Sequence, residues 1–270
     1  MTNKIPKYQD RVVAFIDILG FGKLVTSLES KPEIPQLLFF CLNEIKSYKV
    51  NSEIENTATS KLEVSCFSDS IVMSANEYDL SDIIWACGWL QIQLLTNGIL
   101  TRGGISKGKT IHSNDILYGE GMLKAYKLES KVAVYPRIIL DPHSNFQVSK
   151  DDAFPVSFLK EDSDGLYYID PFSFPGTIGH YCPAVCESFG CNTAHESVSE
   201  SPCMSQGSLD EINQHIEKAI SNVKNAGHLA KWTWLKLKHD TAQKEYWKNK
   251  KKSSKKHKNK RLRLTIRSSR

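Results

Sequence analysis

Two aspartates stand where apolar strands end, and their positions favour a metal site. Asp17 lies in the run RVVAFIDILGFGKLV (residues 11–25), and Asp69 lies in CFSDSIV. If the two strands are neighbours in one sheet, their ends bring together two carboxylates that repel each other when ionised. A divalent cation removes that cost, and Mg²⁺ prefers one or two carboxylates together with phosphate oxygens and water. The carbonyl oxygen of Ile18 is a further candidate ligand.

The turn after Asp17 is suited to a phosphate group. Gly20 allows a close approach of the backbone. Phe21 stands where a helix is expected to begin, and the first N–H groups of a helix can hold phosphate oxygens. A metal beside phosphates indicates a metal–nucleotide site. The alternative is that each aspartate is a turn residue or a helix N-cap, as aspartates at strand ends often are. The spacing alone leaves both interpretations open.

The surrounding chain alternates apolar strands with amphipathic helices. The expected elements are a strand at 11–18, a helix at 32–50, two strands within 61–75 that turn at Ser68–Asp69, a helix at 80–98, a hairpin at 99–119, a helix at 121–130 and a strand at 134–141. This order predicts an α+β fold, a ferredoxin-like palm in which helices cover one face of an antiparallel sheet. We interpret Arg102 and Arg137, both in expected strands, as members of structural ion pairs.

The chain divides into four parts by composition and pattern. Residues 1–141 form the predicted palm, and 142–207 form an irregular segment rich in Ser, Pro, Asp and Gly, with one strand expected at 166–170. A helical extension follows at 208–247, where Trp232 and Trp234 are expected to anchor the core or a dimer. The tail 248–270 is expected to be disordered.

Charge and cysteine content narrow the class of protein. The tail holds 12 Lys or Arg and no acid, and the rest of the chain holds 23 basic and 30 acidic residues. The basic character therefore belongs to the tail, which could touch nucleic acid or an acidic surface non-specifically or simply be solvated.

No apolar run is long enough to span a membrane, and the polar N-terminus does not resemble a signal peptide, so we expect a cytoplasmic protein without disulfides. The Cys- and His-rich loop 180–203 matches no two-pair zinc finger, so we favour a surface loop over a Zn²⁺ site.

Four segments together resemble class III nucleotidyl cyclases, the family of adenylate and guanylate cyclases. FIDILGFGKL is similar to the first metal-binding stretch of that family, SCFSDSIVMS to its second metal hairpin, LTRGGISKG to its Arg-Gly-Ile strand, and LYGEGMLKAYKLES to the helix that carries an Asn and an Arg for the substrate. The resemblance covers residues 11 to 141. It implies two Mg²⁺ or Mn²⁺ ions at Asp17, Ile18 and Asp69, and a triphosphate at Gly20 and Phe21.

Three positions depart from the family pattern. The position of the family's arginine falls on Lys127. Its ammonium group can supply a positive charge to the transferring phosphate, but it cannot make the bidentate hydrogen bonds of a guanidinium group. The position of the asparagine falls on Leu123, which cannot hydrogen-bond a ribose, so either the nearby Lys124 or Tyr126 substitutes for it or the site is weakened. Ser65 stands where purine cyclases carry a base-reading Lys or Glu. This change is compatible with UTP or CTP, as in the pyrimidine cyclases of bacterial antiphage defence, which the compact layout also resembles.

The resemblance implies an enzyme that converts an NTP into a 3′,5′-cyclic mononucleotide and pyrophosphate. Its product would act on a cyclic-nucleotide-responsive effector. Because the family shares each site between two subunits, a homodimer is the expected active form. The alternative is a catalytically degenerate, cyclase-like domain that senses nucleotides, and Leu123 favours it. A palm polymerase is disfavoured because the hairpin carries one acid at Asp69 and not an adjacent pair.

Overall fold

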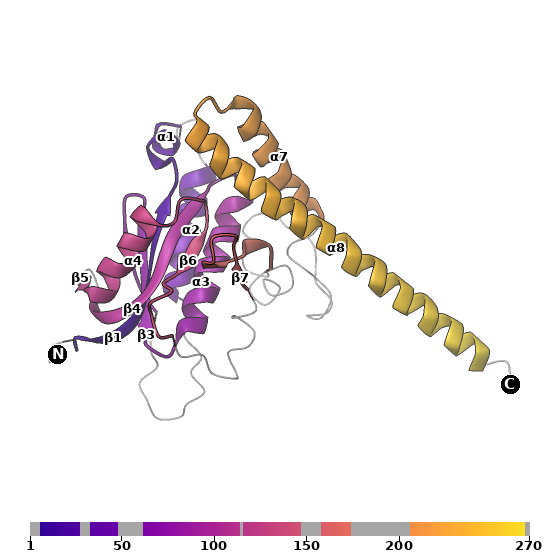
Figure 1. Ribbon diagram of the computed structural model, residues 1–270, viewed down its shortest axis with the longest axis horizontal. Coiled ribbons are helices and arrows are strands. Elements are labelled where there is room, and N and C mark those ends of the chain that lie inside the picture. The colour runs from indigo at the N-terminus through magenta and orange to yellow at the C-terminus, as the bar shows by residue number, and fades with distance from the viewer. Residues whose placement is uncertain are drawn as a thin grey trace.

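The computed structural model describes residues 6–27, 33–47, 62–113, 116–146, 158–173 and 206–267. Within these residues eight strands form one sheet in the order β2-β3-β1-β4-β6-β8-β7, and β5 pairs with β4 off this path (Figure 1). The strands are β1 (Gln9–Ile18), β2 (Glu63–Phe67), β3 (Ser70–Asn76), β4 (Thr101–Ser113), β5 (Ile116–Gly119), β6 (Ile138–Leu140), β7 (Leu159–Glu161) and β8 (Tyr167–Ile169). The helices are α1 (Phe21–Thr26), α2 (Glu33–Ser47), α3 (Leu80–Leu95), α4 (Glu120–Lys131), α7 (Gln206–Asn222) and α8 (Ala226–Arg267), with a 3₁₀ turn η3 (Pro171–Ser173). The predicted α+β class is confirmed.

Strand β1 lies inside the sheet, between β3 and β4, and is buried over most of its length. Residues 11–16 are all buried. Alternate side chains serve different layers: Val12, Ala14 and Ile16 join the main core, whereas Val13 and Phe15 join a second cluster. Because both faces of β1 are apolar, the sheet needs cover on both sides.

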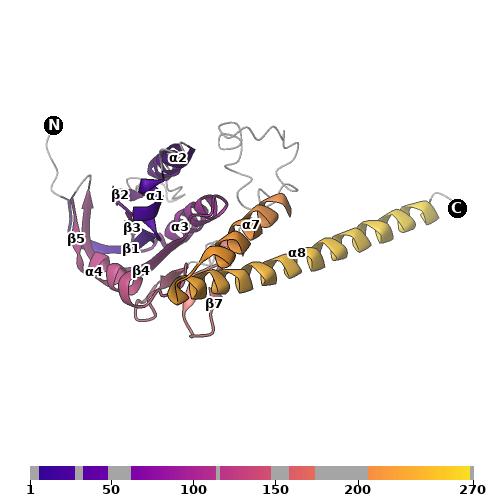
Figure 2. The ribbon, with the colours of Figure 1, turned by 90° about the horizontal axis from the view of Figure 1, so that it is seen from above.

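Helices accordingly flank the sheet on two sides. Helices α2 and α3 pack against the face that holds the main core, and α4 packs against the other face through Ala125. Figure 2 shows α2 and α3 on one side of β1 and β3, with α4 on the opposite side. We expected the helices on one face. The position of α4 follows from the second apolar face of β1, which α4 covers.

Glycine in β4 allows α4 to lie directly on the strand. A Cβ atom on Gly104 would come within 2.7 Å of the carbonyl oxygen of Ala125 in α4. A Cβ atom on the preceding Gly103 would come within 2.7 Å of the carbonyl oxygen of Phe15. After α4 the chain returns as β6, which runs parallel to β4, whereas every other pairing in the described sheet is antiparallel. The sheet is therefore mixed, and α4 is the crossover that makes it so.

A buried ion-pair network fixes α8 to the sheet. The Arg137 side chain is 1% exposed, and its guanidinium donates to Asp162 Oδ2 at 2.6 Å and also pairs with Asp164. From α8, Trp234 Nε1 donates to Asp162 Oδ2 at 2.9 Å, and Lys238 Nζ donates to Asp162 Oδ1 at 2.8 Å. Arg137 is therefore a member of a structural ion pair, as predicted, and Trp234 is an anchor.

The structure of the basic tail differs from the one that we expected. We expected disorder over 248–270, whereas α8 continues through this segment to Arg267 and extends away from the sheet (Figures 1 and 2). Lys and Arg are good helix formers, and no Gly or Pro interrupts residues 228–267. The expected strand at 166–170 is confirmed as β8, and the helical region from 208 as α7 and α8. The loop 180–203 lies outside the described residues, and no described helix is long and apolar enough to cross a bilayer.

Replacing Arg137 by Met should lower the free energy of unfolding by about 3 kcal/mol, because it takes from the buried Asp162 carboxylate one of its two cationic partners. Urea unfolding monitored by circular dichroism measures the change. The matched control is Lys124→Ala, which removes an exposed ion pair with Glu120, N to O 2.9 Å, and should cost about 0.5 kcal/mol or less. Equal losses in the two variants would contradict the buried network as the anchor of α8.

Candidate functional site

The structure brings Asp17 and Asp69 to the same edge of the sheet. The N–H group of Ile18 donates to the carbonyl oxygen of Asp69 at 3.0 Å, which joins the end of β1 to the turn between β2 and β3. That turn consists of Ser68 and Asp69, as predicted, and Ser68 has a φ of 55° in the left-handed region. In register Asp17 lies opposite Ser70 of β3. Asp17 and Asp69 are therefore neighbours without being consecutive in the chain.

A single guanidinium group lies among the carboxylates. Arg102 of β4 is opposite Asp17 in register, and its Nε atom lies 3.4 Å from Asp17 Oδ2. The same Nε atom lies 2.6 Å from Oε1 of Glu129, whose side chain is 4% exposed. Arg102 is thus in an ion pair, as predicted, and it joins β1 to α4. Sequence analysis missed Glu129 as part of this cluster. The available signal was an acid at a position of α4 whose spacing from Gly121 and Ala125 places it on the buried face.

Negative charge remains in excess around Arg102. Burial raises the pKa of Asp17, and the nearby Asp69 raises it further, although Arg102 opposes both effects. Burial likewise raises the pKa of Glu129, with Asp17 adding to the rise and Arg102 opposing it. Raised carboxyl pKa values mean that the cluster favours additional positive charge. A bound cation would supply it.

The donor set fits a hard divalent cation that keeps open positions. No group of three or more His, Cys, Asp or Glu among the described residues is arranged to hold a metal ion alone. Two carboxylates, from Asp17 and Asp69, and the carbonyl oxygen of Ile18 are the ligands on offer. Mg²⁺ is usually bound through one or two carboxylates and takes its remaining ligands from water and substrate phosphates. The arrangement therefore suits Mg²⁺ or Mn²⁺ bound together with a phosphate-bearing substrate.

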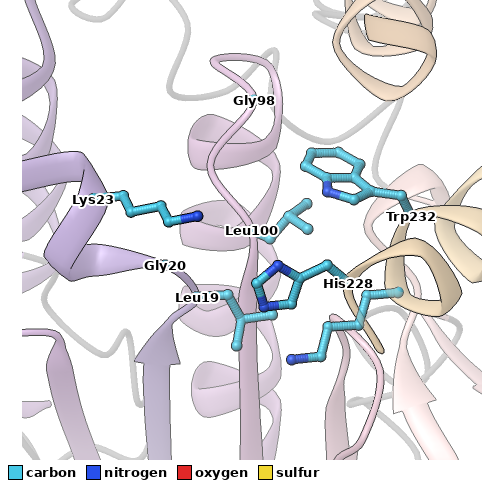
Figure 3. A pocket seen from close by; sticks show the side chains of 8 residues that line it. Leu19, Gly20, Lys23, Gly98, Leu100, His228 and Trp232 are labelled. Carbon is cyan, nitrogen blue, oxygen red and sulfur yellow. The ribbon is translucent and has the colours of Figure 1, made fainter. Parts of the chain in front are cut away.

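The turn at Gly20 is positioned for a ligand by its backbone. Gly20 has a φ of 76°, and its carbonyl oxygen accepts from the N–H groups of Lys23 and Leu24 at 3.0 and 3.1 Å. Phe21 begins α1, which is only six residues long and therefore provides a small helix dipole. Gly20 also lines a pocket that extends toward α8 (Figure 3). Positive charge at this turn thus comes mainly from side chains.

Helix α4 does not turn Lys127 toward the carboxylates of its own chain. Gly121, Ala125 and Glu129, spaced four residues apart, form the face of α4 that is buried against the sheet. Lys127 lies two residues from both Ala125 and Glu129 and is exposed, so it is on the opposite side of the helix. Leu123 shares that outward side. The structure therefore separates Lys127 from Asp17 and Asp69.

Ser65, the expected base-reading position, belongs to a buried hydrogen-bond relay. Its Oγ lies 2.9 Å from His112 Nε2, and His112 Nδ1 lies 2.8 Å from Ser74 Oγ. Arg11 Nε donates to the same Ser74 oxygen at 2.9 Å. Burial, assisted by the charge of Arg11, lowers the pKa of His112 to about 4, so the imidazole is neutral at pH 7. The relay orients the Ser65 hydroxyl, and sequence analysis gave no indication of His112.

Comparisons with known proteins return structural similarity alone. No protein-family model matches the chain, and no curated protein matches it at a significant level. A bacterial light-regulated adenylyl cyclase is 18% identical with a TM-score of 0.37, over 50% of this chain and 77% of that one. A second structure of that description is 16% identical with a TM-score of 0.34, over 51% of this chain and only 44% of that one. The guanylyl cyclase Cya2 is 11% identical with a TM-score of 0.30, over 60% of this chain and 92% of that one. These scores are too low to assign an activity.

Replacing Asp17 by Asn should leave the free energy of unfolding at pH 7 unchanged or raise it by about 0.5 kcal/mol. The folded pKa of Asp17 lies above its ordinary value of 3.8, so the ionised carboxylate costs stability at neutral pH and this cost disappears at lower pH. Any gain in the variant should therefore shrink as the pH falls through this range. Chemical denaturation at several pH values measures it.

The matched control is Asp162→Asn. Burial opposes ionisation of Asp162, but hydrogen bonds from Lys238 and Trp234 outweigh it and lower the pKa of this carboxyl. Its contribution to stability is therefore present at neutral pH and lost as the pH falls through the folded pKa. This variant should lose about 3 kcal/mol at pH 7. A comparable loss in Asp17→Asn would show that Asp17 has a structural role.

Proposed function

We propose that the chain is a metal-dependent nucleotidyl cyclase that converts an NTP into a 3′,5′-cyclic mononucleotide and pyrophosphate. The observation that carries the proposal is the junction of Asp17 and Asp69 through the hydrogen bond from Ile18 N to Asp69 O. It places two carboxylates and a backbone carbonyl at one edge of the sheet, beside the left-handed turn at Gly20. Burial, and after it the charge of Asp69, raise the pKa of Asp17, so its ionised form is favoured when a cation such as Mg²⁺ or Mn²⁺ compensates it.

In the proposed reaction the ribose 3′-oxygen forms a bond to the α-phosphorus while the bond from that phosphorus to the β-phosphate oxygen breaks. Pyrophosphate leaves, and the hydroxyl proton passes to water. The metal, when bound, neutralises triphosphate charge and lowers the pKa of the 3′-hydroxyl. Asp17, Asp69 and the carbonyl of Ile18 would hold it, and Arg102 holds Asp17 in place through the 3.4 Å contact. The chain acts chiefly by positioning and electrostatics.

The outward side of α4 supports a homodimer with two shared sites. Lys127 faces away from its own carboxylates, so it would act on the α-phosphate bound by a partner subunit. Leu123 is 55% exposed and Tyr126 46% exposed on α4, and Phe67 is 85% exposed at the end of β2. Phe67 lies on the α4 side of the sheet. Ser65, which shares a strand face with Phe67, pairs with Val72 of β3, and Val72 belongs to the same apolar cluster as Ala125 of α4. These exposed apolar side chains form a surface that a second copy would cover.

The polar relay at Ser65 favours a pyrimidine nucleotide. The hydroxyl of Ser65 replaces the charged base-reading side chain of the purine cyclases that this sequence resembles, and His112 holds it in place at 2.9 Å. A short hydroxyl leaves the base pocket without a fixed charge. UTP or CTP is therefore the proposed substrate, and a cyclic pyrimidine signal, of the kind used in bacterial antiphage defence, is the proposed output.

A nucleotide sensor without turnover is the second candidate. It rests on Leu123, which stands where the resembling family places a ribose-binding Asn and which cannot donate a hydrogen bond. Lys124 is its nearest polar substitute, but its Nζ atom is paired with Glu120 Oε1 at 2.9 Å. The sensor would bind an NTP and be stabilised by it without releasing pyrophosphate.

Incubating the full chain with each NTP and Mn²⁺ should yield a cyclic mononucleotide and pyrophosphate, with UTP or CTP as the best substrate. Asp17→Asn and Asp69→Asn should each reduce turnover about a thousandfold or more, because each removes a metal ligand. Asp10→Asn, at the other end of β1, is the matched control and should retain activity. Thermal stabilisation by an NTP without product would support the nucleotide sensor instead. A folded, dimeric protein that makes no product from any NTP would contradict the cyclase hypothesis.

Mixing two inactive variants tests the shared site. Asp17→Asn lacks a metal ligand, and Lys127→Ala lacks the charge proposed to act across the interface. A dimer of one copy of each contains one intact site and one doubly altered site. After equal mixing and subunit exchange, about a quarter of the wild-type activity should return, since half of the dimers are mixed and each has one of two sites. If activity stays at the level of the separate variants, Lys127 does not act across a dimer interface.

A further inference from the structure

A pocket of about 180 Å³ lies beside the turn at Gly20, between that turn and the start of α8 (Figure 3). Leu19 and Gly20 line it from the end of β1, and His228, Lys231 and Trp232 line it from α8. Pockets that enclose a whole small molecule usually measure roughly 300–1,000 Å³. This one is smaller and suits a part of a ligand, such as one or two phosphate groups.

The ionisable side chains of the lining are all basic, and the other lining residues are Leu, Gly and Trp. Lys23 of α1 contributes an ammonium group from one wall, and Lys231 and His228 contribute an ammonium group and an imidazole from the other. No Asp or Glu is among the residues that line the pocket. In Figure 3 the side chains of Lys23 and His228 point toward the space between the two walls. Two ammonium groups and an imidazole that line one space without an acid form a site for an anion.

The pocket adjoins the carboxylate cluster electrostatically. Lys231 interacts with Asp17, whose pKa it lowers, and with Arg102. Lys231 also lines the pocket, and Leu19 and Gly20 of the lining follow Asp17 and Ile18 directly in the chain. A bound anion would therefore lie next to the candidate metal ligands and not in a remote part of the molecule.

The first turns of α8 hold the pocket residues in place before any ligand binds. Asn225 caps the helix, with its Oδ1 accepting from the N–H group of His228 at 3.1 Å and its carbonyl oxygen accepting from the N–H group of Leu229 at 2.9 Å. Further along, Trp234 is bound to Asp162 at 2.9 Å. A preformed site loses little entropy on binding.

We infer that Lys23, His228 and Lys231 bind the diphosphate end of the nucleotide, the part that leaves as pyrophosphate. The identity of that ligand rests on the proposed function, whereas the anion site itself rests on the pocket. Helix α8 lies outside the segment that resembles the cyclases, so this chain supplies phosphate contacts from its own C-terminal extension. The contacts select ligands with two or three phosphates over monophosphates.

Titration calorimetry of the full chain with inorganic pyrophosphate, without divalent metal, tests the site. Lys23→Gln and Lys231→Gln should each weaken binding about tenfold, because each removes a charge-assisted hydrogen bond. Lys224→Gln is the matched control: it removes the same charge from an exposed position just before α8 and outside the pocket, and it should bind as the wild type does. Equal affinities for all four proteins would overturn the inference.

Two further measurements separate this inference from the proposed cyclase. Asp17→Asn should bind pyrophosphate at least as tightly as the wild type, because it removes a repelling charge. A large loss of binding in that variant would place the anion at the metal ligands and overturn the pocket. UTP and CTP should bind more tightly than UMP and CMP, and the double variant Lys23→Gln, Lys231→Gln should lose this preference.

The two hypotheses fail in different ways. Lysine-dependent pyrophosphate binding without any cyclic product would contradict the cyclase and leave the anion site in place. Cyclic product formed equally by Lys231→Gln and Lys224→Gln, with the same KM for the NTP, would retain the cyclase and overturn the pocket as its phosphate site.

Discussion

One guanidinium group determines how the sheet can gather acids at the end of β1. Arg102 contacts Asp17 and Glu129 and thereby joins the edge of the sheet to α4. Without it, three carboxylates from separate elements would repel one another at the junction. Arg102 does not cancel the whole charge, because burial and mutual repulsion still raise the pKa of Asp17 and of Glu129. The fold thus holds the cluster together in a state that a divalent cation would relax.

A second buried cation determines what else can reach this cluster. Arg137 pairs with Asp162, and the same carboxylate accepts hydrogen bonds from Trp234 and Lys238 of α8. Losing one partner of such a network is costly, because a charge is left buried. The network therefore fixes the start of α8 near the turn at Gly20, although the two are 206 positions apart in a chain of 270 residues. Structural stability and the cationic side of the site depend on the same contacts.

The sequence predicted best where the information is local. The apolar strand that contains Asp17 near its end and the two-residue turn at Ser68–Asp69 follow from neighbouring residues, and both are found in the structure. Strand β6 is only three residues long, where eight were expected, because Pro136 offers no N–H group and Arg137 N donates to Tyr135 O instead. Glu129 and His112 have roles that depend on contacts between distant elements. The helical spacing places Glu129 on the buried face of α4 but does not name its partner Arg102, and no local pattern marks His112 or the contribution of Lys231.

The two sides of α4 determine what the departures at Leu123 and Lys127 can affect. The buried side gives Glu129 to the subunit's own cluster, and Gly104 lets that side approach the strand closely. The helix therefore cannot rotate to bring Lys127 inward without breaking the ion pair and the packing. In the proposed homodimer, Lys127 would act on the second molecule and Leu123 would lie at the partner's ribose site. The rigidity of α4 in one subunit would then contribute to the specificity of the site that it completes in the other.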